Sequence, residues 1–531
     1  MSQLRVSLTI SGAVSLGAYE GGALAALLYA VRELTAGEDP ALRVDVISGA
    51  SAGSITGLLT ARTLLQGQDP ETVMAAAWVT DDSIGDLLAQ GTQAPLSIDA
   101  MRQMGTGLLD PGPGKSSPHR QTAGIRLSYT LACLRGFEYQ LPRLGRGPVP
   151  AAAFIDTYDH VLSPDAPLTS LTGPRGDCPL DAVLASGANE MGFPPYLLSR
   201  ARQWPIYQED GIDNLPPGPA RSFWFSDGGT LDNEPLGRTL DLANEADADG
   251  VPSRRLHLLI HPHPAAAIHD LSWAKPDVQP TFAQTAVRGL SLQRSQSIYD
   301  DLKRVEKTNT HIAWINRLGD GLAPVLDQLP AEARETVTSA LRDAIADMAR
   351  EADVLRGQRS GTVNEGAPGS GQGSSPEPAG DSGPGELLSR ALRTASGLVG
   401  KQAARVDVIS PLLLLPESGV TSIDQLLSGE VLFHFGGFLD KKMRRNDFDL
   451  GYRSTLKWLE DGGLTDAGLT AELNEQAKAA AQNSYSPQEG WKQTGKTTTA
   501  SLLAMHPWQA ARLAGRVTHV LLHDILHHPR P

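Results

Sequence analysis

A serine framed by glycines, Gly49-Ala50-Ser51-Ala52-Gly53, is the feature that most limits how this chain can fold. Alternating small residues of this kind let the backbone turn sharply from a strand into a helix, with the serine at the apex of the turn. The surroundings fit, because a β-branched apolar run at 44–47 precedes the pentapeptide and a mostly apolar, helix-compatible run at 54–65 follows it. One match can arise by chance in a chain with 54 glycines, so this candidate nucleophile elbow needs support from its neighbours.

A strand, a glycine-containing loop and the start of a helix coincide upstream of the elbow. Apolar and polar side chains alternate over 4–10, the loop Ser11-Gly12-Ala13-Val14-Ser15-Leu16-Gly17 follows, and an apolar helical stretch covers 18–34. The free N–H groups of such a junction, with the positive end of the helix dipole behind them, suit a developing negative charge on oxygen. The junction is therefore a candidate oxyanion hole. A nucleotide phosphate loop is the alternative, but the GxGxxG spacing and the GK[ST] ending are both missing.

The order of these motifs distinguishes between the folds of serine hydrolases. Only one strand, one loop and one helix precede the strand that leads into the elbow, which is too little chain for the usual order of an α/β-hydrolase. A fold whose first βα loop supplies the oxyanion donors and whose second βα turn supplies the serine needs only the residues present.

A carboxylate at the end of an aromatic strand is the candidate general base. Phe223-Trp224-Phe225-Ser226 runs into Asp227-Gly228-Gly229, where the two glycines allow a close approach to another segment of backbone. An isolated Asp-Gly-Gly is more often an ordinary turn, because these residues tolerate positive φ. Its combination with the elbow and the upstream loop favours Asp227 as the base.

Together these segments resemble the patatin-like phospholipases, the lipid acyl hydrolases with a Ser-Asp dyad. The stretch 12–21 resembles the glycine-rich oxyanion block of the family, 49–53 its GxSxG, 184–195 its Ala/Ser-rich, FP-ending stretch, and 227–229 its DGG. One departure concerns the oxyanion block, in which Leu16 stands where the family has Arg or Lys. Because main-chain N–H groups build such a hole, the departure leaves the donors in place but removes a cation.

The resemblance implies a three-layer α/β/α fold with a central, mostly parallel sheet and additional C-terminal helices. It also implies an enzyme that hydrolyses carboxylic esters of lipids, with Ser51 as nucleophile and Asp227 as base. The N–H groups of Gly12, Ala13 and Val14 would hold the oxyanion, and no histidine, metal or other cofactor is required. The alternative, motivated by the altered oxyanion block, is a catalytically weak or silent lipid-binding or scaffold protein with the same fold.

The histidines offer a competing reading of the chemistry. His261 and His263 follow the apolar strand at 256–260 and could belong to a Ser-His-Asp triad, although His-Pro-His-Pro is more often a rigid loop exit. His519 and His523 have the i, i+4 spacing of a metal pair on a helix, but no glutamate lies between them and no third ligand is evident. We therefore expect neither a triad nor a metal site.

The remainder of the chain predicts a continuation of the same fold. We expect a catalytic domain at 1–357, a disordered Gly/Ser/Pro-rich insertion at 358–385, and a C-terminal part at 386–531 that continues the fold with a helical extension. Residues 311–315 and 406–415 have the apolar runs of buried strands, and 331–355 have the period of an amphipathic helix that packs on the core.

A C-terminal block, 435–451, resembles a segment of some bacterial patatin-like proteins. It carries Arg444 and Arg445, for which pairing with acidic residues near the core is favoured over a site for substrate phosphate.

Composition limits the partners and the location of the protein. A net charge of −14 argues against nucleic acid as a partner and against electrostatic docking on anionic membranes as the main driving force. Cys133 and Cys178 are the only cysteines, which favours a reducing compartment. With no signal peptide evident and no apolar stretch of about 18 residues expected, we predict a cytoplasmic protein with a lipid or acyl ester substrate and peripheral contact with membranes.

Overall fold

The computed structural model describes residues 3–80, 87–88, 94–110, 119–143, 146–216, 221–247, 253–264, 281–359, 383–396, 398, 403–420, 422–429, 435–484 and 507–527. The insertion predicted at 358–385 falls largely outside these described residues.

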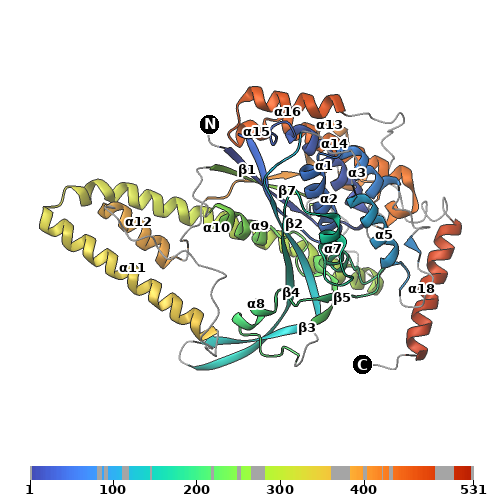
Figure 1. Cartoon of the computed structure of the whole chain (residues 1–531), viewed down its shortest axis with the longest axis horizontal. Helices are drawn as coiled ribbons and strands as arrows, with labels where there is room; N and C mark the ends of the chain where they lie inside the picture. Colours follow the sequence, from blue (N-terminus) through green and yellow to red (C-terminus); the bar gives the residue numbers. More distant parts are fainter. Residues whose placement is uncertain are drawn as a thin grey trace.

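A mostly parallel sheet forms the centre of the protein (Figure 1). Its eight described strands are β1 (Gln3–Ile10), β2 (Leu42–Gly49), β3 (Ile125–Arg143), β4 (Arg146–Leu162), β5 (Tyr196–Ser199), β6 (Ser222–Asp227), β7 (Ser253–Ile260) and β8 (Val406–Ile409). The order is β5-β6-β3-β2-β1-β7-β8, with β4 paired to β3. The pairs β1–β2, β1–β7, β2–β3 and β7–β8 are parallel, whereas β4, β5 and β6 join in antiparallel pairs.

Helices cover both faces of this sheet, which gives the three-layer α/β/α arrangement expected from the sequence. Successive side chains of a strand point to opposite faces. Val46 of β2 packs against Leu242 and Ala243 of α9 (Leu236–Asp247), while its neighbour Ile47 belongs to the main core on the other side. The mixed α/β fold with a central, mostly parallel sheet is therefore confirmed.

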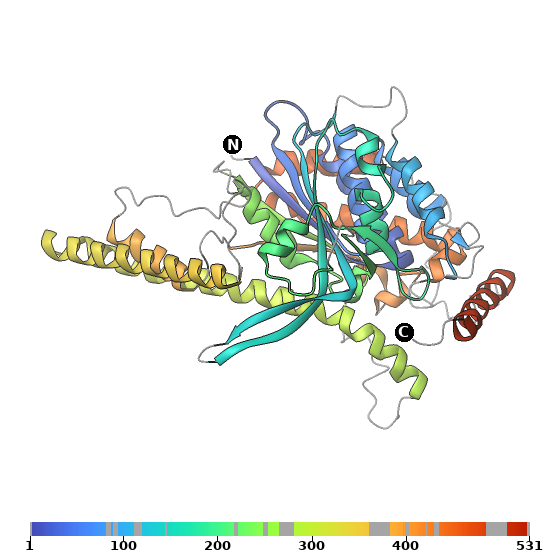
Figure 2. The ribbon, with the colours of Figure 1, turned by 60° about the horizontal axis from the view of Figure 1, so that its bottom comes forward.

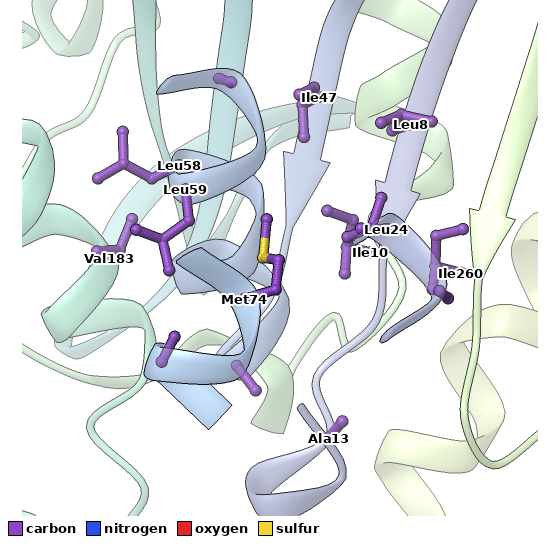
Figure 3. Close-up of a cluster of buried hydrophobic side chains, with 14 of the residues drawn as sticks. Leu8, Ile10, Ala13, Leu24, Ile47, Leu58, Leu59, Met74, Val183 and Ile260 are labelled. Carbon is purple, nitrogen blue, oxygen red and sulfur yellow. The ribbon is translucent and has the colours of Figure 1, made fainter. Parts of the chain in front are cut away.

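The main core lies between the sheet and the helices on the face opposite α9. Its helices include α1 (Gly17–Val31), α2 (Ala52–Gln66), α3 (Pro70–Ala75), α5 (Ile98–Leu109) and α7 (Pro179–Ser186). Short helices α6 (Leu168–Thr172) and α8 (Trp204–Glu209) flank the later strands. Figure 3 shows part of this core, with strand side chains such as Ile10 and Ile47 opposite helix side chains such as Leu58, Leu59 and Val183.

Helix α1 is buried on all sides because C-terminal helices cover it. Every residue of Gly17–Val31 is buried, and α1 packs against α14 (Lys441–Glu460) and α16 (Ala471–Ser484) as well as α2 and α3. Between α14 and α16 lies the short α15 (Gly463–Asp466), and α13 (Leu415–Ser418) follows β8. An apolar surface around the whole helix is what such burial requires.

The stretch Val14–Val31 is long and apolar enough to cross a membrane, and 94% of it is buried inside the protein. The expectation that the sequence lacks an apolar stretch of this length is therefore wrong. Within the described residues this stretch is a core helix, which explains its composition.

One long helix runs along the main body and continues beyond it, where two further helices join it to form an arm (Figures 1 and 2). They are α10 (Phe282–Asp327), α11 (Ala331–Arg359) and α12 (Pro384–Ala395), and α12 packs against both of the others. Residues 311–315, expected to form a strand, lie inside α10, where Ile312 and Ile315 face one side of the helix and contact Leu398. The helix predicted at 331–355 is confirmed as α11, which contacts α12 through Ile345 rather than the main core.

The other outlying element is α18 (Pro507–His527), which lies apart from the sheet in both views. Of the run expected to form a strand at 406–415, only Val406–Ile409 is β8. Pro411 ends the strand and begins a short 3-10 helix, because proline cannot donate to the sheet.

Candidate active site

Ser51 occupies the turn between β2 and α2 in a backbone conformation that few residues adopt. Its φ is 51° and its ψ is −121°, and among the described non-glycine residues only Val14 also has a positive φ. The flanking glycines are sterically required: a Cβ on Gly49 would lie 2.5 Å from the carbonyl oxygen of Gly53, and a Cβ on Gly53 would lie 2.3 Å from that of Ile10. The turn thus has the geometry of a nucleophile elbow, at a backbone cost of about 1–3 kcal/mol.

The sheet brings Ser51 and Asp227 together although 176 residues separate them in the sequence. β4 pairs along one edge of β3, so β2 and β6 must both pair with its other edge. They run in opposite directions and end almost head to head, with Gly49 opposite Tyr129 and Asp227 opposite Leu131. As a result the Ser51 hydroxyl donates a hydrogen bond of 3.0 Å to Oδ2 of Asp227.

Asp227 is fully buried and is oriented by further donors. Nδ2 of Asn189 donates to Oδ2 at 3.2 Å, and the N–H of Gly229 donates to Oδ1 at 2.9 Å. Gly228 lets the segment approach β3 closely, because a Cβ there would lie 2.0 Å from the carbonyl oxygen of Thr130. The predicted Asp-Gly-Gly therefore uses both glycines, one for a close approach and the other as a donor.

Two residues of the Ala/Ser-rich stretch connect Ser51 with Asp227, and the sequence analysis assigned no role to either. The Ser186 hydroxyl accepts from the backbone N–H of Ser51 at 3.0 Å, and Asn189, three residues later, binds Asp227. The sequence could have indicated both residues, because they lie between the elbow and the Asp-Gly-Gly in the Ala/Ser-rich segment noted above.

The loop after β1 lies directly beside Ser51. A Cβ on Gly12 would lie 3.2 Å from Cβ of Ser51. The N–H of Gly12, however, donates to the carbonyl of Asn233 at 2.9 Å, and Nδ2 of Asn233 returns a bond of 3.0 Å to the Gly12 carbonyl. The expectation that Gly12 donates to an oxyanion needs correction in this conformation, because its hydrogen is already used.

Ala13 and Val14 retain free main-chain donors. Within the part of the chain that the structure describes, neither N–H has a hydrogen-bond partner. Val14 has a φ of 53°, which is strained for a β-branched residue, and a 3-10 turn (Val14–Leu16) then leads into α1. Figure 3 shows Ala13 on this loop, beyond Ile10 at the end of β1. Strain of this kind gathers at functional sites, and here it falls on the serine and the loop next to it.

Comparison with known proteins agrees with this geometry. Residues 8–125 match the family model of the patatin-like phospholipases, a segment that contains the loop after β1 and the elbow. Residues 8–125 of the chain are therefore a patatin-like phospholipase segment. A crystal structure of VipD from Legionella pneumophila is similar at 12% identity over 100% of this chain and 92% of that chain, with a TM-score of 0.19, too low to carry an argument. No curated protein sequence matches the chain.

A buried glutamate lies behind the loop that follows β1. Glu20 of α1 is fully buried and accepts from the hydroxyls of Ser11 and Thr56, each at 3.4 Å. Burial raises the pKa of Glu20 well above its ordinary value, and the charge of Glu234 adds to the effect. Burial therefore favours the uncharged form of Glu20, which lies next to Ser11 at the start of the loop after β1.

In the part of the chain that the structure describes, the Ser51 hydroxyl bonds to a carboxylate rather than to a histidine. The hydrogen-bond partner of the Ser51 side chain is a carboxylate, and the nearest described acidic contact of His261 is Glu234, with 3.7 Å between Nε2 and Oε1. Burial lowers the pKa of His261 to about 3, with His263 adding to the shift, so His261 is neutral at physiological pH. Among the described residues no three His, Cys, Asp or Glu side chains are grouped to hold a metal ion.

An apolar cavity of about 50 Å³ lies one helical turn beyond the Ser51 turn. Ile55 of α2 lines it together with Val183 and Leu184 of α7, and Trp78 and Met104 line it as well. Helix α2 begins after Ser51 and helix α7 ends at Ser186, so the two helices that line the cavity also position Ser51.

Proposed function

We propose that the protein is a lipid acyl hydrolase that cleaves carboxylic esters by two-step acyl transfer. Asp227 accepts the proton of the Ser51 hydroxyl as Ser51 attacks the ester carbonyl, and it passes that proton to the leaving alcohol. The N–H groups of Ala13 and Val14 stabilise the tetrahedral oxyanion. Water, activated by the same carboxylate, then releases the acyl group from Ser51. The observation that carries the proposal is the 3.0 Å hydrogen bond between Ser51 and Asp227.

The apolar cavity supports an acyl chain as the part of the substrate that enters the protein. It is smaller than the roughly 300–1,000 Å³ typical of small-molecule pockets, so it suits the end of a chain rather than a whole lipid. Gly105 borders it, and a Cβ at that position would lie 2.7 Å from a methyl group of Leu180. Gly105→Val is expected to shift preference toward shorter acyl chains in a panel of p-nitrophenyl esters, since each methylene contributes about 1–3 kcal/mol.

We further propose that the protein works in the cytoplasm and contacts membranes peripherally, where its substrate is found. Flotation with vesicles and cell fractionation test this, and recovery only in the soluble fraction with no vesicle binding would contradict it.

The central experiment is product analysis with phospholipids, neutral glycerides and short-chain esters. We expect fatty acid release by the wild type, none by Ser51→Ala, and a loss of about 10²–10⁴-fold in Asp227→Asn. His261→Ala is the discriminating variant, because a Ser-His-Asp triad predicts that it abolishes turnover while Asp227→Asn is tolerated. Turnover that persists in Ser51→Ala would overturn the assignment of the nucleophile.

A silent lipid-binding or scaffold protein is the second candidate, favoured by the hydrogen bond that occupies the N–H of Gly12 and by Leu16 at the basic position. A labelled fluorophosphonate separates the two. Covalent attachment at Ser51 supports the hydrolase, whereas a well-folded protein that stays unlabelled supports the scaffold.

A further inference from the structure

Two C-terminal loops contact the loop at 11–16 after β1, the oxyanion loop of the proposed function: one includes Gly429 and the other contains the 3-10 helix Gly436–Leu439. The N–H of Gly437 donates to the hydroxyl of Ser15 at 3.1 Å. A Cβ on Gly437 would lie 2.7 Å from that hydroxyl oxygen, and a Cβ on Gly429 would lie 3.2 Å from it. Both loops lie far outside the segment that matches the family model, which ends at residue 125.

Helix α14 holds these two loops through a pair of buried charges one turn apart. Nη1 of Arg444 donates to the carbonyl of Gly437 at 2.8 Å, and the two carboxylate oxygens of Asp447 accept from the N–H groups of Ser428 and Gly429 at 2.7 and 2.8 Å. Arg444 is 2% exposed and Asp447 is fully buried. Charged hydrogen bonds at buried positions fix geometry more firmly than neutral ones at a surface.

The same arginine also holds the wall of the apolar cavity. Nε and Nη2 of Arg444 donate to the carbonyl of Val79 at 3.2 and 2.9 Å. Val79 follows Trp78, whose ring lines the cavity and packs on the start of α1, where a Cβ on Gly17 would lie 2.4 Å from it. One guanidinium therefore connects the loop beside Ser15 with the segment beside the cavity.

The oxyanion loop needs such support because Val14 is strained. A residue at a φ of 53° keeps that conformation only when its neighbours over-determine it. The two residues that follow, Ser15 and Leu16, are both fully buried, and the C-terminal loops touch each of them.

We propose that Arg444 is a positioning residue, which acts through Gly437 and Ser15 to keep the N–H groups of the oxyanion loop aimed at the reacting carbonyl. The inference rests on the proposed hydrolase function and extends it to residues in the C-terminal block. Its neighbour Arg445 serves as a control, because it forms ion pairs with Glu71 at 3.1 Å and Asp449 at 2.9 Å instead.

The experiment compares Ser15→Ala, Arg444→Met and Arg444→Lys with Arg445→Met on a soluble ester. Each kcat is expressed per active site titrated with a fluorophosphonate, so that a smaller folded fraction does not count as slower chemistry. We expect Ser15→Ala and Arg444→Met to lower kcat at least 10-fold with KM changed less than about threefold, since loss of an oxyanion donor costs about 10²–10³-fold. Arg444→Lys keeps a donor and should recover part of the loss, and Arg445→Met should stay within about twofold of the wild type.

An unchanged kcat per titrated site in Ser15→Ala would overturn the inference, even if the arginine variants fail to fold. A trifluoromethyl ketone reacts with the serine to form a hemiketal oxyanion, so its affinity for the variants should fall in parallel with kcat. An unchanged affinity would also count against the inference. Absence of Ser51-dependent turnover in the wild type would instead refute the proposed function.

Discussion

Replacing Gly22 by alanine tests how the N- and C-terminal halves of the core are joined. Gly22 of α1 faces α14, and a Cβ there would lie 1.8 Å from the carbonyl oxygen of Phe448. The contact is reciprocal, because a Cβ on Gly451 of α14 would lie 1.9 Å from the carbonyl oxygen of Tyr19. Both obstacles are helix backbone, so no side chain can rotate away.

The expected loss of stability in Gly22→Ala follows from this short separation between the added Cβ and the Phe448 oxygen. Carbon and oxygen atoms need more than 3 Å, so Gly22→Ala must move the two helices apart by more than 1 Å along their tightest line of contact. Overpacking of a core costs about 1–3 kcal/mol and occasionally more, and a shift of two buried helices belongs at the upper end. With an unfolding entropy near 1 kcal/mol/K for a chain of 531 residues, about 3 kcal/mol lowers the Tm by about 3 °C.

Gly107→Ala is the matched control. Gly107 lies in helix α5 and nothing stands within 4 Å of its missing Cβ. The same substitution should therefore be neutral or stabilise by about 0.5–1 kcal/mol, through helix propensity alone. The assay is thermal unfolding of the two variants beside the wild type. Equal Tm values for Gly22→Ala and Gly107→Ala would refute the reasoning.

Two further predictions concern buried charges. Burial and the nearby charge of Asp301 raise the pKa of Asp232 to about 7, so its contribution to stability is complete below its unfolded value of about 3.8 and is lost as the pH rises through 7. Between pH 4 and pH 8, the free energy of unfolding of Asp232→Asn should rise relative to that of the wild type by on the order of 4 kcal/mol. Thermal unfolding at a series of pH values measures this, and parallel stability curves for the two proteins would contradict it. Arg255 pairs with Asp45 at 2.8 Å and Asp247 at 2.6 Å, so Arg255→Met leaves these carboxylates with Arg5 alone, at 4.0 and 3.2 Å. The loss of the two shorter pairs should cost about 3–5 kcal/mol in urea unfolding, and a loss below about 1 kcal/mol would show that Arg5 suffices.

Local sequence patterns predicted the elements near the site because those elements depend on neighbouring residues in the sequence. The alternation over 4–10 is that of β1, and the pentapeptide around Ser51 forms the expected turn. The run at 311–315 was misread because four or five apolar residues fit a strand and a buried helix equally well. Ile312 and Ile315 lie on one side of α10, where they contact a residue that is distant in sequence.

The finer features of the site depend on contacts between distant segments, which no local pattern reveals. That the N–H of Gly12 is occupied follows from its pairing with Asn233, more than 200 residues away. The orienting role of Asn189 depends on where β6 ends. The catalytic roles of Ser51 and Asp227 remain predictions that activity measurements will decide.

The head-to-head meeting of β2 and β6 along one edge of β3 has a consequence for biosynthesis. A nascent chain that has left the ribosome as far as the elbow carries the serine but neither the acid nor the strand that holds it, and α14 emerges later still. On the proposed function, a translation product that ends before β6 therefore lacks the carboxylate that would activate Ser51 and leaves the lipids around it intact.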